Sequence, residues 1–148
     1  MSPDLDSLQG SITIYRHRRS GDLQVQPMCR RGRYGLAEAG RSIPVQWGDD
    51  ARLRFVVEQA LGSFLTNTFD EHSRGLSPEE QAQFLREHDA ITIDLVGDEL
   101  TVTPLEHTRG GFTSLREGST RLELPFSAEV LSAALLEAFR RASGVSVR

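Results

Sequence analysis

Three of the four histidines stand beside acidic residues, and both kinds of side chain can bind metals or transfer protons. These pairs are Glu71-His72, Glu87-His88-Asp89 and Glu106-His107. A metal site or an acid–base pair needs such groups to converge in space. However, no two histidines have the spacing of a helical zinc motif, and adjacent residues point to different faces of a helix or strand. We therefore predict solvated surface pairs, with no catalytic residue, no metal ligand and no cofactor.

The candidate nucleophiles also lack the neighbours that would activate them. Cys29 is the only cysteine, which excludes an internal disulfide, and Arg30 and Arg31 could lower the pKa of its thiol. A nucleophilic cysteine also needs a positioned base, which no motif supplies. The sequence contains neither a glycine-rich phosphate loop nor the Gly-x-Ser-x-Gly elbow of hydrolases. We predict that this protein is not an enzyme and that it works by binding.

Charge is distributed unevenly along the chain, although the net charge is only −4. Residues 1–41 carry seven arginines and four acids, a local charge of +3, whereas residues 49–99 carry twelve acids and four arginines, a local charge of −8. The acids of this middle region include Asp49, Asp50, Asp70, Glu71, Glu79, Glu80, Glu87 and Asp89. An acidic surface suits a basic protein partner, because complementary charge speeds association and disfavours wrong partners.

An arginine-rich segment near the N-terminus suggests an alternative function. Its residues are Arg16, Arg18, Arg19, Arg30, Arg31, Arg33 and Tyr34. Arginines with an aromatic neighbour can bind nucleic acid through phosphate contacts and base stacking. A dedicated nucleic-acid-binding domain is usually basic as a whole, whereas this chain is acidic. We therefore expect no nucleic acid partner and keep a small nucleic-acid-binding or regulatory protein as the alternative.

Alternating apolar residues predict strands in the N-terminal part of the chain. Residues 1–10 are predicted to be a disordered leader. Residues 12–15 alternate as a strand does, and residues 23–27 form a second strand. Pro27 places this second strand at a sheet edge, because proline cannot donate a hydrogen bond to a ladder. Residues 30–35 are predicted to be a basic, glycine-rich connection.

Two helices are predicted in the middle of the chain. The first begins after Asp49 or Asp50 and has one apolar stripe, formed by Leu53, Val56, Val57, Ala60, Leu61 and Phe64. The second is short and ends near His88. It opens with a capping box, the reciprocal side-chain and backbone pairing at a helix start, formed by Ser77-Pro78-Glu79-Glu80.

The last third of the chain predicts a hairpin, a strand and a long helix. Residues 91–95 and 100–103 alternate on either side of the Gly97-Asp98 turn, and residues 121–124 form a further strand. Ser127 caps the closing amphipathic helix, which Gly144 stops. Amphipathic helices and half-apolar strands bury their apolar sides together. The sequence therefore predicts an α+β fold, a mostly antiparallel sheet with two longer amphipathic helices and one short helix packed on it.

We predict a single domain over residues 11–143, followed by a loose tail at 144–148. No segment approaches 18 consecutive apolar residues, so no membrane-spanning helix is expected. The N-terminus is acidic and lacks the basic and apolar regions of a secretory signal, which predicts a cytoplasmic protein.

Several short segments together resemble the immunity proteins of bacterial contact-dependent growth inhibition systems. They include Thr101-Val102-Thr103-Pro104, Gly110-Gly111-Phe112, the strand from Leu122 to Pro125, and the closing run from Ser127 to Phe139. Two upstream segments also fit: Gly32-Arg33-Tyr34-Gly35-Leu36, and Asp49-Asp50-Ala51 opening a helix that ends at Ala60-Leu61. The matches cover most of residues 12–142, whereas residues 64–84 depart from the family pattern.

The resemblance implies a cytoplasmic protein that binds the C-terminal toxin domain of a cognate surface-delivered effector. That domain is often a basic nuclease, and binding covers its active site or an exosite without any chemistry by the immunity protein. Such proteins vary most where they touch the toxin. The predicted toxin-binding residues therefore lie in and beside the departing region: Phe69, Asp70, Glu71, Glu79, Glu80, Glu87 and Asp89. The acids would mimic phosphates, with Phe69, Trp47 and Phe84 as candidate apolar anchors.

Overall fold

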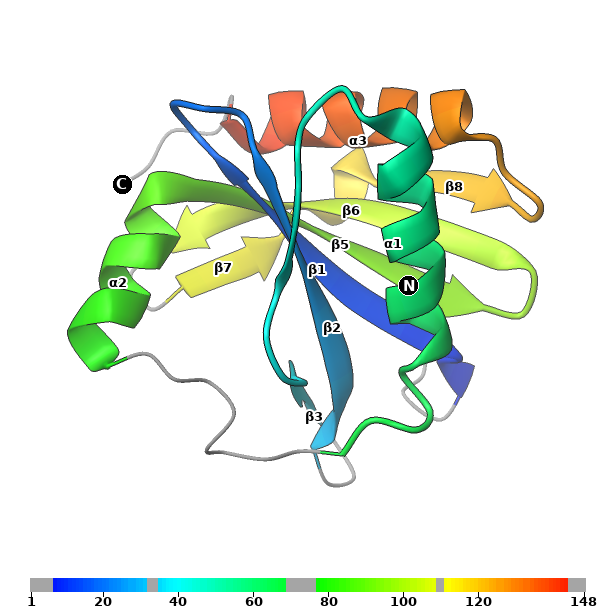
Figure 1. The fold of residues 1–148 in the computed structure, drawn as a ribbon, viewed down its shortest axis with the longest axis horizontal. Helices are drawn as coiled ribbons and strands as arrows, with labels where there is room; N and C mark the ends of the chain where they lie inside the picture. The colour runs from blue at the N-terminus through cyan, green and yellow to red at the C-terminus, as the bar shows by residue number, and fades with distance from the viewer. Residues whose placement is uncertain (1–6, 32–34, 69–76, 109–110, 144–148) are drawn as a thin grey trace.

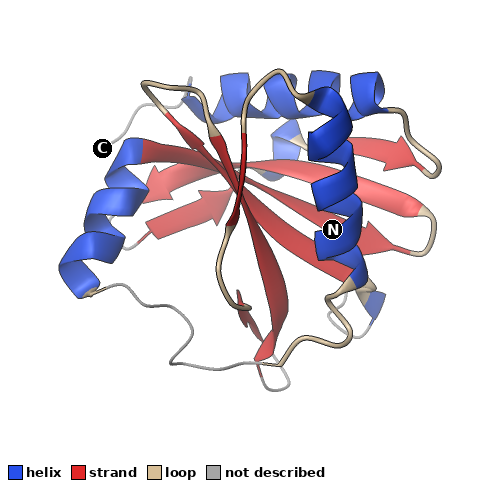
Figure 2. Cartoon of the chain, viewed as in Figure 1, coloured by secondary structure: helices blue, strands red, loops and turns tan. Residues whose placement is uncertain are grey.

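A computed structural model describes residues 7–31, 35–68, 77–108 and 111–143. In these residues eight strands form one curled antiparallel sheet with three α-helices packed on it, which confirms the predicted α+β fold (Figure 1, Figure 2). The elements in chain order are β1 (Gly10–His17), β2 (Leu23–Arg31), β3 (Gly35–Glu38), β4 (Ile43–Val45), α1 (Asp50–Gly62), α2 (Pro78–Glu87), β5 (His88–Val96), β6 (Glu99–Thr108), β7 (Gly111–Ser114), a 3-10 turn (Arg116–Gly118), β8 (Thr120–Glu123) and α3 (Ala128–Ser143).

The pairing of β1 with β5 joins the two halves of the sheet. The strand order is β3-β2-β1-β5-β6-β7, with β4 also paired to β2 and β8 to β6. In the β1–β5 register, Ile12 lies opposite Ile93 and Ile14 opposite Ile91. Directly opposed residues share a face, so these four isoleucines form the centre of one apolar face, and all four are fully buried.

The two longer helices cover this apolar face. The predicted stripe of α1 is buried as expected, and α3 contributes Leu131, Leu135 and Phe139 to the same core. Both helices are capped as predicted, because the Asp49 carboxylate accepts a hydrogen bond from Arg52 N and the Ser127 hydroxyl accepts one from Val130 N. The core is therefore a layer between helices and sheet.

The short helix α2 covers only one end of the opposite face. There Tyr15, Ala90 and Leu105 form a small apolar cluster, against which Phe84 and Leu85 of α2 pack. The rings of Tyr15 and Phe84 lie 5.0 Å apart in an edge-to-face arrangement. Since α2 provides no fully buried side chain, its attachment depends on these partly buried contacts.

Polar side chains occupy the opposite face beyond α2. Ser11, Thr13, Gln26 and Thr103 are buried there. The Ser11 hydroxyl donates to Asp94 Oδ1 at 2.8 Å, and burial raises the pKa of the Asp94 carboxyl despite this hydrogen bond. The two faces of the sheet are thus chemically different, as period-two alternation requires.

Two predictions about β2 are wrong. Residues 30–35 are not a simple connection, because β2 continues to Arg31 and β3 begins at Gly35, with Cys29 opposite Ala37. The strand is not at an edge either. Pro27 lies between the residues of β2 that pair with β4 and those that pair with β3, so its missing N–H falls where the partner strand changes.

The predicted leader is wrong for residues 8–10. Leu8 is buried, Gln9 N donates to Leu95 O at 2.8 Å, and Gly10 begins β1. Residues 1–6, the tail at 144–148 and the helix stop at Gly144 lie outside the described residues. No helix in the described part of the chain is long and apolar enough to cross a membrane.

Two glycines provide a test of how closely α1 packs on β1. A Cβ added to Gly10 would lie 3.0 Å from Leu61 O, whereas one added to Gly62 would meet nothing within 4 Å. We expect Gly10→Ala to lower the free energy of unfolding by about 1–3 kcal/mol, because the backbone of β1 or of α1 at Leu61 must shift to make room for the methyl group. We expect Gly62→Ala to raise it by about 0.5 kcal/mol through helix propensity. Urea denaturation measures both, and equal effects would contradict the close approach of Leu61 to Gly10.

Candidate functional site

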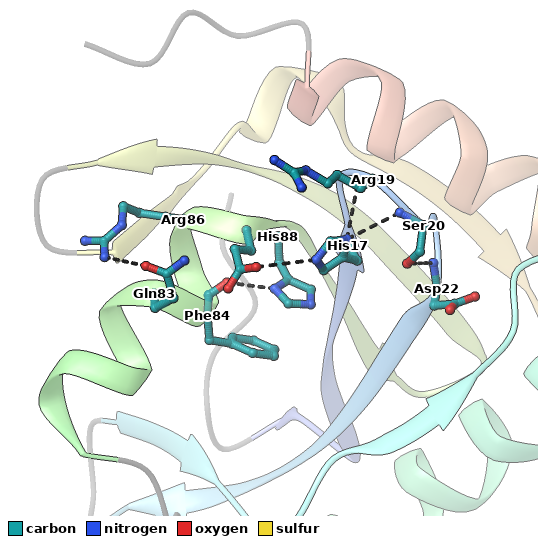
Figure 3. A network of polar contacts seen from close by, with 9 residues as sticks. His17, Arg19, Ser20, Asp22, Gln83, Phe84, Arg86 and His88 are labelled. Carbon is teal, nitrogen blue, oxygen red and sulfur yellow. Dashed lines mark hydrogen bonds and ion pairs between the residues drawn. The ribbon is translucent and has the colours of Figure 1, made fainter.

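Histidines and acids from distant parts of the sequence meet at one end of the sheet. β1 ends at His17, β5 begins at His88 directly after α2, and the register places these two histidines opposite each other. Their rings lie 5.1 Å apart and perpendicular (Figure 3). The prediction of solvated pairs is wrong for His88 and Asp89, which are both buried, because α2 turns directly into the central strand β5. His72 lies outside the described residues.

His17 is fixed by the turn between β1 and β2. Its Nδ1 accepts hydrogen bonds from Arg19 N at 3.1 Å and Ser20 N at 3.3 Å, so in the neutral ring the proton is on Nε2. That Nε2 lies 3.6 Å from Glu87 Oε2. The carboxylate of Glu87, a predicted toxin contact, therefore faces a histidine of its own chain.

His88 is held in the opposite tautomer. The Phe84 carbonyl can only accept, so the 2.7 Å contact means that His88 Nδ1 carries the proton. The imidazole also stacks on the Phe84 ring at 3.9 Å. Burial lowers the pKa of His88 below its ordinary value. The Phe84 carbonyl opposes this change, nearby His17 reinforces it, and Glu87 and Asp89 oppose it.

The carboxylate of Asp89 lies beside Arg18, the residue that follows β1, and beside His107 of β6. Its Oδ1 accepts a hydrogen bond from Arg18 Nε at 3.2 Å. The same oxygen lies 3.5 Å from His107 Nε2, a contact that is an ion pair only with a protonated imidazole, and that buried nitrogen makes no hydrogen bond among the described residues. Asp89 was predicted to touch the toxin, but its side chain is only 10% exposed. It therefore joins the start of β5 to the ends of β1 and β6.

The described residues of this cluster contain no activated thiol. Cys29 lies six residues along β2 from Leu23, which pairs with Arg16, so it is about 20 Å from the histidines. Burial also raises the pKa of the Cys29 thiol. No three His, Cys, Asp or Glu side chains converge as metal ligands in the described ranges. The cluster functions as a set of hydrogen-bond and ion-pair partners that attach α2 to the sheet.

The other predicted toxin-binding residues divide into two groups. Glu79 and Glu80 are exposed in the first turn of α2, where the capping box is confirmed, since Glu80 Oε1 accepts from Ser77 N and Ser77 Oγ from Glu80 N. Phe69, Asp70 and Glu71 lie outside the described residues. The structure thus places Glu79 and Glu80 at the outer end of α2 and Glu87 and Asp89 in the histidine cluster.

Two arginines of the proposed nucleic-acid surface are engaged within the protein. The guanidinium of Arg16 lies 4.8 Å from the centre of the Trp47 ring, and Arg18 binds Asp89. Trp47 itself packs against the core and Phe84 against the smaller cluster, so these two candidate anchors contribute to the fold. Arg33 and Tyr34 lie outside the described residues.

A groove at the other end of the sheet was missed by sequence reasoning. It has a volume of about 570 Å³ and lies between the end of α1, the β5–β6 hairpin and the segment before α3. Its walls include Leu61, Gly62, Leu95, Asp98 and Leu124. We call it the hairpin groove. Local patterns cannot reveal it, because it is formed by three segments far apart in the chain.

His88 predicts a pH dependence of stability. Its pKa is lower in the folded protein than in the unfolded chain, so its contribution to the free energy of unfolding is complete above the ordinary pKa of about 6.5 and is lost as the pH falls below it. Asparagine keeps an amide N–H near Nδ1 but does not titrate. We expect His88→Asn to lose less Tm than the wild type between about pH 7.5 and about pH 5. Thermal melts measure this, and equal losses would contradict the buried neutral state.

Removing one negative charge is expected to destabilise the protein at Asp89 and to have little effect at Glu79. Asp89→Asn leaves Arg18 and His107 without their carboxylate, so we expect the free energy of unfolding to fall by about 1–3 kcal/mol. Glu79 is exposed, so we expect Glu79→Gln to change the free energy of unfolding by no more than about 0.5 kcal/mol. Urea denaturation compares the two, and equal stability of both variants would show that Asp89 is an ordinary surface charge.

Comparisons with known proteins identify the fold. No family model matches the chain, and no curated protein matches its sequence. A solved structure described as a protein of unknown function, NMB0488 from Neisseria meningitidis, is similar with a TM-score of 0.69 and 18% identity, over 96% of this chain and 99% of the other. A chain of the CdiA-CT/CdiI toxin and immunity complex from Yersinia pseudotuberculosis is similar with a TM-score of 0.61 and 15% identity, over 91% of this chain and 99% of the other. The chain therefore shares its fold, over 91% of its length, with a chain of a toxin and immunity complex.

Proposed function

We propose that this chain is a contact-dependent growth inhibition immunity protein, which binds and neutralises the C-terminal toxin domain of a cognate effector in the cytoplasm. The observation that carries the proposal is the fold shared with a chain of the CdiA-CT/CdiI complex over nearly the full length of both. A match over 91% of this chain and 99% of the other is much longer than a shared supersecondary motif. The segments that resemble the family in sequence support the same proposal.

The charge of the chain suits a basic toxin domain such as a nuclease. Residues 49–99, which include α1, α2 and the β5–β6 hairpin turn, carry the local charge of −8. A protein that holds nucleic acid is basic where it contacts phosphates. Acids that occupy this basic surface would speed association and exclude the substrate. The proposed mechanism is therefore occlusion of the toxin by an acidic surface, with no chemical step by this protein.

The acids contribute to this mechanism in different ways. Glu79 and Glu80 are exposed and available to a partner. Phe69, Asp70 and Glu71 stay predicted contacts of the toxin domain. Asp89 and Glu87 instead face Arg18 and His17 of their own chain. Their charges still add to the long-range potential, but a direct contact with the toxin would first have to compete with these internal partners.

The proposal predicts a tight one-to-one complex. The probe is the C-terminal domain of the large secreted protein encoded directly upstream of this gene, measured by isothermal titration calorimetry. We expect nanomolar affinity, a Kd that weakens by about tenfold or more between roughly 50 and 500 mM NaCl, and suppression of the toxin's growth inhibition in cells.

The controls distinguish the alternative function. An unrelated toxin domain of similar charge should not bind, since immunity depends on more than charge. Absence of binding by the upstream domain, with salt-sensitive retention of this protein on heparin, would replace the proposal by the nucleic-acid alternative.

A further inference from the structure

The hairpin groove has mostly apolar walls. The β5–β6 hairpin, which lines it, lies at the end of the molecule opposite α2 (Figure 1). Leu61 and Phe126 are buried in its floor, while Leu124 in its wall is 37% exposed. The two-residue turn Gly97-Asp98, which joins β5 to β6, bounds the groove on one side through Asp98. Three elements that are fixed by their own packing thus leave an apolar depression between them.

Gly62 keeps the groove open. It is the last residue of α1 and lines the groove, and a Cβ built on it would meet nothing within 4 Å. Its φ is not in the left-handed region, so the backbone itself would tolerate a side chain. A larger residue would fill the space that the glycine leaves.

Helix α1 carries one large exposed apolar side chain, Phe55, which is 57% exposed. Phe55, Glu58 and Gly62 are spaced at i, i+3 and i+7, so they lie along one face of α1 that leads to the groove. Single exposed apolar residues are common, but apolar residues that continue a groove are typical of an interaction surface.

The charge beside the groove is negative. Glu58 and Asp98 line it; Glu58 pairs with Arg54, while Asp98 has no ion-pair partner among the described residues. The next strand residue, Glu99, lies directly opposite Glu123 in the β6–β8 register, and Arg121 is the counter-ion of Glu99. Four acids therefore face two arginines at this end, a local charge of −2. Two glutamates opposed across a ladder destabilise a sheet unless a cation is near them.

We propose that the hairpin groove is the docking site for an apolar side chain of the toxin domain that has a lysine or arginine beside it. The apolar side chain would fill the space over Leu61 and Leu124, and the cation would lie between Glu58 and Asp98. This inference rests on the proposed function and specifies which surface of the protein would contact the toxin domain. An apolar anchor in a pocket with a neighbouring charge is the usual form of an interface hot spot.

Other occupants fit the groove less well. Pockets for small molecules add a few converging hydrogen-bonding groups, both donors and acceptors, to their apolar walls, whereas the polar side chains among the lining residues here are two carboxylates. A second copy of this chain would bring its own negative charge, since the protein carries −4 overall. A toxin surface that is basic and partly apolar would complement both the negative charge and the apolar walls of the groove.

The experiment measures the affinity of the upstream toxin domain for four variants by calorimetry. Gly62→Trp fills the groove, and Gly62→Ala is its matched control at the same position. Asp98→Asn removes one charge at the groove, and Asp22→Asn removes one from the exposed β1–β2 turn, beside His17 at the other end of the sheet. We expect Gly62→Trp to weaken binding by about 100-fold and Asp98→Asn by about tenfold, with both controls within about threefold of the wild type.

Hydrogen exchange on the unmodified complex provides a second readout if Gly62→Trp does not fold. We expect protection on binding at residues 58–62, 95–100 and 124–126, which contain the groove. If the toxin domain binds the wild type and the groove variants with equal affinity, the groove is not the docking site and the proposed function still stands. Protection at residues 77–89 in place of the groove residues would have the same meaning. Absence of wild-type binding would overturn both. A dimer in sedimentation experiments that Gly62→Trp dissociates would assign the groove to a second copy and overturn the toxin as its occupant.

Discussion

The register between β1 and β5 is the constraint on which the rest of the structure depends. It places Ile12 and Ile14 opposite Ile93 and Ile91 on the face that α1 and α3 cover. It also places His17 opposite His88. Because strand side chains alternate, a slip of one residue would turn polar residues towards the helices and the isoleucines towards the other face. The apolar core thus fixes the histidine cluster, although the two share no side chain.

This constraint explains why acids that are similar in sequence have different roles. Asp89 belongs to the central strand β5, so its carboxylate is buried and needs Arg18 and His107 as partners. Glu79 and Glu80 lie on a helix that attaches only through its last turns, and they stay in solvent. Burial, rather than charge, therefore separates structural acids from those free to meet a partner.

The parts of the fold that were predictable have local causes. The capping box at Ser77, the turn at Gly97 with its φ of 61°, and the stripe of α1 each depend on residues close in sequence. β3 was missed because its four residues gain a strand conformation only from pairing with β2. The histidine cluster and the hairpin groove were missed because segments far apart in the chain come together to form each of them.

The two ends of the sheet differ in what they offer a partner. At the α2 end, His17, Glu87 and His88 already have partners within the protein, so a toxin that contacts these side chains would have to replace internal bonds. At the hairpin end, α1 stops at Gly62 before it covers Leu95 and Leu124, and apolar surface stays in water. Covering that surface gains free energy without breaking any internal contact. An acidic protein that works by binding would therefore gain most affinity at the hairpin end, while the charge of the whole chain speeds the encounter.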